Sequence, residues 1–212
     1  MKTSRIVAAA TAALMAVALA ACGSSSSSSQ TTSTAAAKDP KTAQLDAPAT
    51  LTPTKPAPDF TLQNSHGQNV TLSQFHGKAV LLTFIYAHCP DVCPLIVSNL
   101  HNALGTMGQQ ASKAQVVAVS VDPKGDTPKA VNEFIKAHEM TGKMQYLIGT
   151  KKKLVPVWKK WGVGVQSTPD SREVDHSAFV YGITGSGQVS ALYPSNFKPA
   201  WIVHDAPLLA AR

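Results

Sequence analysis

Two cysteines lie close together in the chain, with two prolines beside them. Cys89 and Cys93 fall within the run His-Cys-Pro-Asp-Val-Cys-Pro at 88–94. An apolar run at 79–85 precedes the pair, and apolar residues at helical spacing follow it, so the cysteines are expected where a buried strand ends and a helix begins. If the second half of this run is already helical, positions four apart share a face, with Cβ atoms about 5–6 Å apart. Both sulfurs could then reach one ion or each other.

The same location favours the thiolate form of the cysteines. The exposed N–H groups of a helix N-terminus stabilise negative charge. The thiolate is the form of cysteine that binds metal. The pair is therefore a candidate metal site, with a structural disulfide as the plain alternative.

A histidine far along the chain could complete this site. His176 follows Val174 and Asp175 and stands at the entrance to a predicted strand, 177–183. Two soft thiolates and an imidazole suit copper, because thiolates favour Cu(I) and the nitrogen also accommodates Cu(II). A structural zinc site would usually require a fourth ligand. We therefore expect one copper ion per chain, held by Cys89, Cys93 and His176.

Several polar residues could assist the three candidate ligands. Asp91 and Asp175 are expected to orient His176 or to set its tautomer, although Asp91 could equally cap the helix. His88 is an alternative ligand that we predict against, because it lies on the other side of Cys89. The loop at 122–128 could border the site, but its simpler interpretation is a turn with Asp126 or Thr127 as a helix cap.

The elements that position these residues alternate between strand and helix. A β-hairpin is predicted at 59–72, around a turn at 64–67. Strands are expected at 79–85, 116–121, 145–148, 177–183 and 188–193, and helices at 95–107, 128–140, 154–161 and 199–211. This order predicts an α/β fold of the thioredoxin-like, peroxiredoxin-related type. A mixed sheet is flanked by helices and extended by the N-terminal β-hairpin.

The first part of the chain is expected to be a signal and a tether. Lys2 and Arg5 precede the uncharged run 6–21, which is too short for the roughly 20 residues of a membrane span, and small residues end it. We predict a lipoprotein signal peptide at 1–21 with lipidation of Cys22. Residues 22–55, rich in Ser, Thr, Ala and Pro, are predicted to form a disordered linker. The folded domain is then 56–212, held outside the cytoplasm on the cell membrane.

Charge and cysteine count limit the possible functions. The net charge of +7 is too modest and too dispersed to indicate nucleic-acid binding. The densest basic cluster consists of Lys151, Lys152 and Lys153 with Lys159 and Lys160, and it could be a docking patch for an acidic partner or a solvated helix face. If Cys22 carries lipid, only Cys89 and Cys93 remain, and in an oxidising compartment they would close into a disulfide unless reduced.

Three motifs in this order resemble the SCO/SenC family. They are the segment 84–94, the loop 120–128 with its Asp-Pro and Asp-Thr-Pro pairs, and Asp175-His176-Ser177. The resemblance implies a thioredoxin-like copper protein of cytochrome c oxidase assembly, with Cys89, Cys93 and His176 as copper ligands. It also implies a partner that is an oxidase subunit or another copper carrier.

Two functions from different classes follow. The first is a metallochaperone that binds copper and passes it on by ligand exchange, without covalent catalysis. The second is an extracytoplasmic thiol–disulfide oxidoreductase that uses only the two sulfurs. Oxidation of the pair would remove two copper ligands, so the two roles could be combined as a redox-controlled release of copper.

Overall fold

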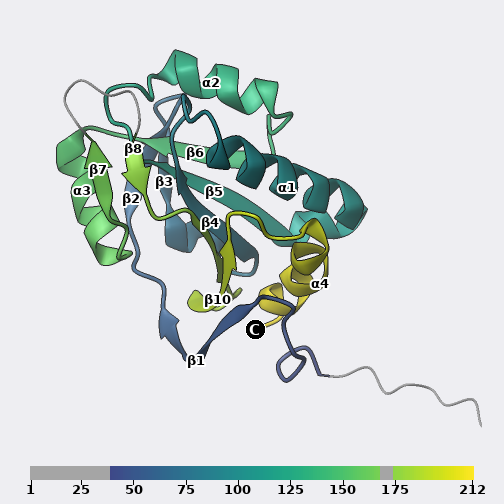
Figure 1. The fold of residues 1–212 in the computed structure, drawn as a ribbon. Helices are drawn as coiled ribbons and strands as arrows, with labels where there is room; N and C mark the ends of the chain where they lie inside the picture. Colours follow the sequence, from purple (N-terminus) through teal and green to yellow (C-terminus); the bar gives the residue numbers. More distant parts are fainter. Residues whose placement is uncertain (1–38, 168–173) are drawn as a thin grey trace, which may run out of the picture. The chain divides into compact units, whose positions relative to one another are not determined.

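A computed structural model describes residues 39–167 and 174–212 (Figure 1). The predicted signal peptide, the lipidation site Cys22 and the first part of the predicted linker lie outside these residues. The described residues belong to one compact unit, Ala37–Arg212. None of its described helices is both long and apolar enough to cross a membrane.

The described residues form a mixed eight-stranded sheet in the order β1-β10-β9-β4-β5-β6-β2-β3. The central strands β4, β5 and β6 run parallel, and the flanking strands are antiparallel. A separate two-stranded sheet pairs β7 with β8. The strands are β1 Ala49–Pro56, β2 Thr61–Asn64, β3 Asn69–Thr71, β4 Ala79–Ile85, β5 Ala114–Ser120, β6 Met144–Ile148, β7 Val165–Ser167, β8 Val174–His176, β9 Phe179–Ile183 and β10 Gln188–Pro194.

Helices cover both faces of the large sheet. They are α1 Val92–Met107, α2 Pro128–Ala137, α3 Lys151–Lys160 and α4 Pro199–Ala210, with 3₁₀ turns at Leu72–Phe75 and Gly108–Lys113. Gly182 faces Leu209 of α4, whereas its neighbour Tyr181 packs on Trp161, just after α3. Successive residues of a strand point to opposite faces, so α3 and α4 cover different sides of the sheet. Helix α1 packs beside α4 (Figure 1).

The central strands owe their position to their composition. All seven residues of β4 are buried, and β5 is buried apart from Gln115. A parallel strand covered on both faces reads as such a continuous apolar run. The carboxyl ends of β4 and β5 therefore meet at one edge, where the Val121 amide donates to the Ile85 carbonyl at 3.0 Å. The residues that follow both strands are brought together there.

The predicted thioredoxin-like α/β fold with its N-terminal hairpin, β2–β3, is confirmed. Thr127 caps α2 as one of the two expected residues, since its side chain accepts a hydrogen bond from the Ala130 amide. The surroundings of His176 differ from the prediction. This residue ends β8, which pairs with β7, and it does not lead directly into the strand at 179–183. Two three-residue strands are too short to give a recognisable period, so this pairing was missed.

The boundary between linker and domain lies earlier in the chain than predicted. Residues 49–55, predicted as part of the disordered linker, lie in β1, Ala49–Pro56, which pairs with β10 at the sheet edge. Leu45 and Ala47 are buried. A low content of large apolar residues indicated disorder, but β1 is an exposed edge strand whose backbone hydrogen bonds, rather than its side chains, attach it to the domain.

Candidate metal centre

The loop between β4 and α1 places the two cysteines at the edge of the sheet. The Cys89 amide donates to the Tyr86 carbonyl at 3.3 Å, so the chain turns immediately after β4. Helix α1 then begins at Val92, with Cys93 in its first turn. Pro94 is tolerated there because the first amides of a helix have no partner within it. Cys93 is completely buried and Cys89 is 9% exposed, so Cys89 is the sulfur that faces outward.

The electrostatics of the pair favour one thiolate beside one thiol. The Cys93 amide donates to Cys89 Sγ at 3.5 Å. A hydrogen bond from the Cys93 thiol, together with those from the Asp91 and Cys93 amides, outweighs burial and lowers the pKa of Cys89 to about 5. The same hydrogen bond, together with burial, raises the pKa of Cys93. At neutral pH the negative charge therefore resides on Cys89.

The His176 ring reaches the cysteine pair from β8. Its Nε2 atom lies 4.0 Å from Cys93 Sγ, and its Nδ1 atom lies 3.1 Å from the Ser177 carbonyl oxygen. Burial lowers the pKa of His176, which favours the neutral ring. A carbonyl can only accept, so Nδ1 carries the proton and Nε2 has the free lone pair. The nitrogen nearest to the sulfurs is therefore the one able to bind a metal.

The spacing of the donor atoms is close to that of a metal site but does not fully match it. With bonds of about 2.3 Å to sulfur and 2.0 Å to nitrogen, the zinc values, two ligands of one ion lie at most about 4.3 Å apart. The 4.0 Å between Cys93 and His176 satisfies this limit. Among the described residues, however, the three donor atoms do not all lie within 4.8 Å of one another. The Cys93 side chain is hydrogen-bonded to Cys89 and also contacts the His176 ring. The distance that exceeds the limit is therefore the one between Cys89 Sγ and the His176 ring nitrogen. This distance must shorten if one ion binds all three residues.

A family model, SCO1/SenC, matches residues 48–209 and so spans all three of these side chains. The chain belongs to the SCO1/SenC family. The SCO2-like protein RP587 of Rickettsia prowazekii is 30% identical over 134 residues, which is 61% of this chain and 64% of that protein. Protein SCO1 homolog 1 of Arabidopsis thaliana is 32% identical over 126 residues, 58% of this chain and 37% of that protein. The chain thus spans less than two thirds of the length of these curated relatives.

Solved structures of SCO proteins share the fold. Bradyrhizobium japonicum ScoI, determined with copper bound, superposes with a TM-score of 0.65 at 26% identity, covering 72% of this chain and 98% of that one. Apo Sco1 of Thermus thermophilus superposes with a TM-score of 0.65 at 32% identity, covering 77% and 95%. The family prediction from the sequence is confirmed.

Tyr86 is a neighbour of the centre of this SCO1/SenC protein that the sequence analysis missed. Its ring packs edge-on against His176, with the ring centroids 6.0 Å apart. Its hydroxyl accepts a hydrogen bond from the Val174 amide at 3.4 Å. Burial raises the pKa of Tyr86 to about 12, so the phenol stays neutral beside the cysteine thiolate. Tyr86 thereby links the end of β4 to the β8 strand that carries His176.

Asp126 holds the loop between β4 and α1 through a hydrogen bond from the backbone of that loop. It is buried, and its carboxylate accepts hydrogen bonds from the Ala87 amide at 2.8 Å and the Tyr146 hydroxyl at 2.9 Å. Burial raises its pKa to about 6. The partners of Asp126 lie 39 and 20 residues away, so the sequence predicts it only as a helix cap or as part of a bordering loop.

Within the part of the chain that the structure describes, neither Asp91 nor Asp175 makes a hydrogen bond to the His176 ring. Asp91 occupies the N-cap position of α1, but its side chain makes no capping hydrogen bond, and it is exposed. Asp175 is also exposed, and the atom that faces Nδ1 of His176 is the Ser177 carbonyl oxygen. The ring of His88 groups instead with carboxylates of Asp122 and Asp126, within 4.8 Å. That His88 is not a copper ligand stays a prediction.

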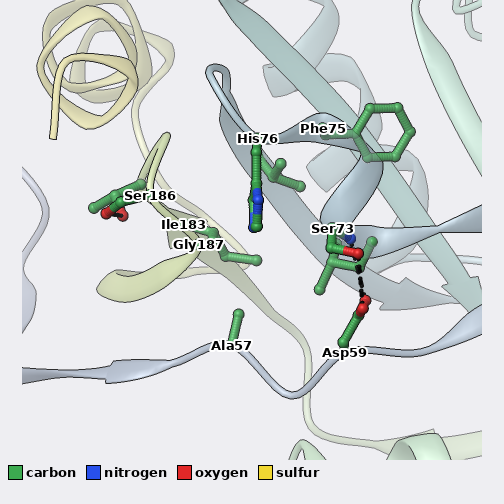
Figure 2. A pocket seen from close by; sticks show the side chains of 11 residues that line it. Ala57, Asp59, Ser73, Phe75, His76, Ile183, Ser186 and Gly187 are labelled. Atoms are coloured by element: carbon green, nitrogen blue, oxygen red, sulfur yellow. Dashed lines mark hydrogen bonds between the residues drawn. The ribbon is translucent and has the colours of Figure 1, made fainter.

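A pocket of about 260 Å³ lies apart from this centre (Figure 2). Its one carboxylate, Asp59, is engaged by Ser73, whose hydroxyl and amide donate to it at 2.7 and 3.1 Å. No candidate ligand contributes to its wall. The pocket is lined by Ala57, Asp59, Leu72, Ser73, Phe75, His76, Val80, Ile183, Thr184, Ser186 and Gly187.

Proposed function

We propose that this SCO1/SenC protein is a copper carrier that binds one copper ion through Cys89, Cys93 and His176. The observation that supports it best is the pairing of Cys93 Sγ with the unprotonated Nε2 of His176, 4.0 Å apart, beside a second sulfur. Two sulfurs and an imidazole are a donor set that suits copper. The copper bound to the related Bradyrhizobium japonicum ScoI supports the same assignment.

The chemistry of the three side chains suits uptake and release. Cys89 is already a thiolate at neutral pH, so binding to it displaces no proton, whereas Cys93 must lose its proton when the metal arrives. The neutral His176 ring offers a nitrogen without prior deprotonation. Three ligands leave a copper ion open to an incoming fourth, and copper can therefore pass to a recipient by exchange of one ligand at a time.

The proposals for the recipient and the location rest on the family resemblance and on the N-terminal sequence. We propose that copper passes to a subunit of cytochrome c oxidase or to another copper carrier, as the family resemblance implies. We also propose that lipidated Cys22 anchors the protein to the outer side of the cell membrane, with the segment after it as a tether. A lipid anchor confines donor and recipient to one surface and raises their effective concentration.

The test is copper uptake by the reduced unit 37–212, measured as metal per chain after dialysis and by sulfur-to-copper charge-transfer absorption. We expect one copper per wild-type chain and its loss in Cys89→Ser, Cys93→Ser and His176→Ala. His66→Ala, which removes an exposed histidine from the β2–β3 turn, is the matched control and should bind normally. Reduced wild-type protein that binds no copper, or a Cys89→Ser protein that keeps it, would refute the carrier function.

A second function, thiol–disulfide exchange, is favoured by the asymmetry of the cysteines. A thiolate on Cys89, which is buried but 9% exposed, beside a thiol on the completely buried Cys93 is the arrangement of an attacking and a resolving cysteine. In that step Cys89 forms a mixed disulfide and releases one thiolate of the substrate. Cys93 then displaces the other, so the substrate is reduced and the pair is oxidised.

The His176→Ala variant separates the two functions. The exchange step uses only the sulfurs, so its rate with dipyridyl disulfide should survive this substitution while copper binding is lost. If instead His176→Ala abolishes exchange and copper binding together, the two activities cannot be assigned to separate ligand sets.

A further inference from the structure

Five lysines form the exposed side of helix α3. They are Lys151, Lys152, Lys153, Lys159 and Lys160, and each is exposed. Lys152 and Lys159, like Lys153 and Lys160, are seven residues apart, which is two helical turns and therefore the same side. We call these five residues the α3 lysine patch.

Packing fixes which side of α3 faces outward. Leu154, Val157 and Trp158 are buried, and the Trp158 indole N–H donates to the Ser120 carbonyl at 2.9 Å. With 100° per residue, these three side chains occupy the part of the helix circumference that the lysines leave free. The helix cannot turn its lysines toward the protein without breaking this contact.

The patch has no compensating charge within α3. The helix contains no acidic residue, and its first turn consists of three lysines at the end where the helix dipole disfavours positive charge. Where the described lysines do form ion pairs, as Lys129 does with Glu133 on α2, the partner lies one turn away. A fold-stabilising role would favour acidic residues in the first turn, where Lys151, Lys152 and Lys153 stand, so these three lysines indicate an external anion. Lys159 and Lys160 lie in the last turn, where the dipole favours positive charge.

We propose that the α3 lysine patch adsorbs to the surface of an anionic lipid bilayer. The patch is the outer side of a helix and consists of flexible point charges. Lysine is depleted in protein–protein interfaces, where arginine and aromatic residues dominate, whereas lysine clusters bind anionic membrane surfaces through summed electrostatic attraction. The chemistry therefore fits a surface of phosphate headgroups better than a single acidic protein partner.

Adsorption would bring the candidate metal centre near the membrane. Lys160 precedes Val165 of β7 by five residues, at most about 18 Å of chain, and Val165 pairs with His176. A patch lying on the bilayer would thus hold the hairpin that carries His176 close to the lipid surface. This orientation is separate from metal binding, because the patch contains no proposed ligand.

The test is binding of the unit 37–212, which contains the entire described core, to vesicles of equal parts phosphatidylglycerol and phosphatidylcholine at low salt. The variant K151Q/K152Q/K153Q is compared with K129Q/K136Q/K143Q, which loses the same charge from exposed positions on and after α2. We expect the first to bind about a hundredfold more weakly and the second to bind like wild type. Phosphatidylcholine vesicles should bind none of the three proteins.

Three outcomes would overturn the proposal. Wild type could fail to bind the anionic vesicles, or both variants could lose affinity equally, which would show that net charge alone acts. The third outcome is that wild type shows no binding to the vesicles but binds polyglutamate, and that K151Q/K152Q/K153Q loses this binding. That result would assign the patch to an acidic protein partner. Circular dichroism and copper uptake of each variant separate these outcomes from misfolding and from failure of the copper function.

Discussion

At the scale of single residues, the asymmetry between the two sulfurs predicts a pH profile. Because the pKa of Cys89 is lowered to about 5, mainly by the Cys93 thiol, Cys89 is a thiolate at pH 7. Alkylation of the reduced, copper-free protein by iodoacetamide should be half-maximal near pH 5 and flat above pH 7, whereas a free cysteine gains rate through about pH 8.5. Mass spectrometry of the peptides should place the label on Cys89, since Cys93 keeps its proton and is completely buried.

The substitution Cys93→Ala removes the main hydrogen-bond donor to Cys89. The midpoint of the alkylation profile should then move to higher pH, whereas the His66→Ala control should leave it unchanged. A midpoint that stays near pH 5 in Cys93→Ala would mean that the helix amides, and not the thiol, stabilise the thiolate.

The sequence indicated which side chains could form this centre, because residue type and spacing are local properties. It did not indicate how they are oriented. Besides Cys93, the Ser177 carbonyl and the Tyr86 ring contact the His176 ring, whereas the expected Asp91 and Asp175 are exposed. Any residue has a carbonyl, so a backbone partner leaves no mark in the sequence.

At the scale of the elements, Asp126 joins three of them and should make stability depend on pH. It connects the loop after β4, the loop before α2, and β6 through Tyr146. Its folded-state pKa of about 6 lies above the ordinary aspartate value of 3.8, so protonation of Asp126 stabilises the fold. This contribution is complete below about pH 4 and declines as pH rises through 6, by up to about 3 kcal/mol.

Urea unfolding of the copper-free protein between pH 4 and pH 8 measures this contribution. Asp126→Asn stays neutral and can still accept from the Ala87 amide, so its stability relative to wild type should rise across that window. Glu133→Gln removes an exposed carboxylate from α2 and is the matched control. Parallel pH curves for wild type and Asp126→Asn would show that the buried carboxylate does not titrate in this range.

At the scale of the whole molecule, residues 39–56 belong to the folded domain because distant residues hold them. Asp205 of α4 is completely buried and accepts hydrogen bonds from the Asp46 and Ala47 amides at 2.7 and 2.9 Å. It also accepts one from the Tyr193 hydroxyl at 2.8 Å. The Arg212 side chain donates to the carbonyls of Pro40 and Ala43. Asp205 and Arg212 lie 158 to 172 residues from the groups they bond in this segment, so local composition indicated only a linker, whereas the periodic strands and helices of the core were predicted correctly.

Deletion therefore tests where the domain begins. A chain that starts at Ala57 leaves Asp205 without two of its amide donors and removes the burial of Leu45, so it should be less stable than one that starts at Asp39 by roughly 4–6 kcal/mol. Urea unfolding of both chains measures the difference, and Asp205→Asn in the longer chain should lose part of it, because the amide oxygen still accepts one bond. Equal urea midpoints for the two chains would mean that residues 39–56 do not stabilise the domain, and that the linker extends to residue 55 as its composition indicated.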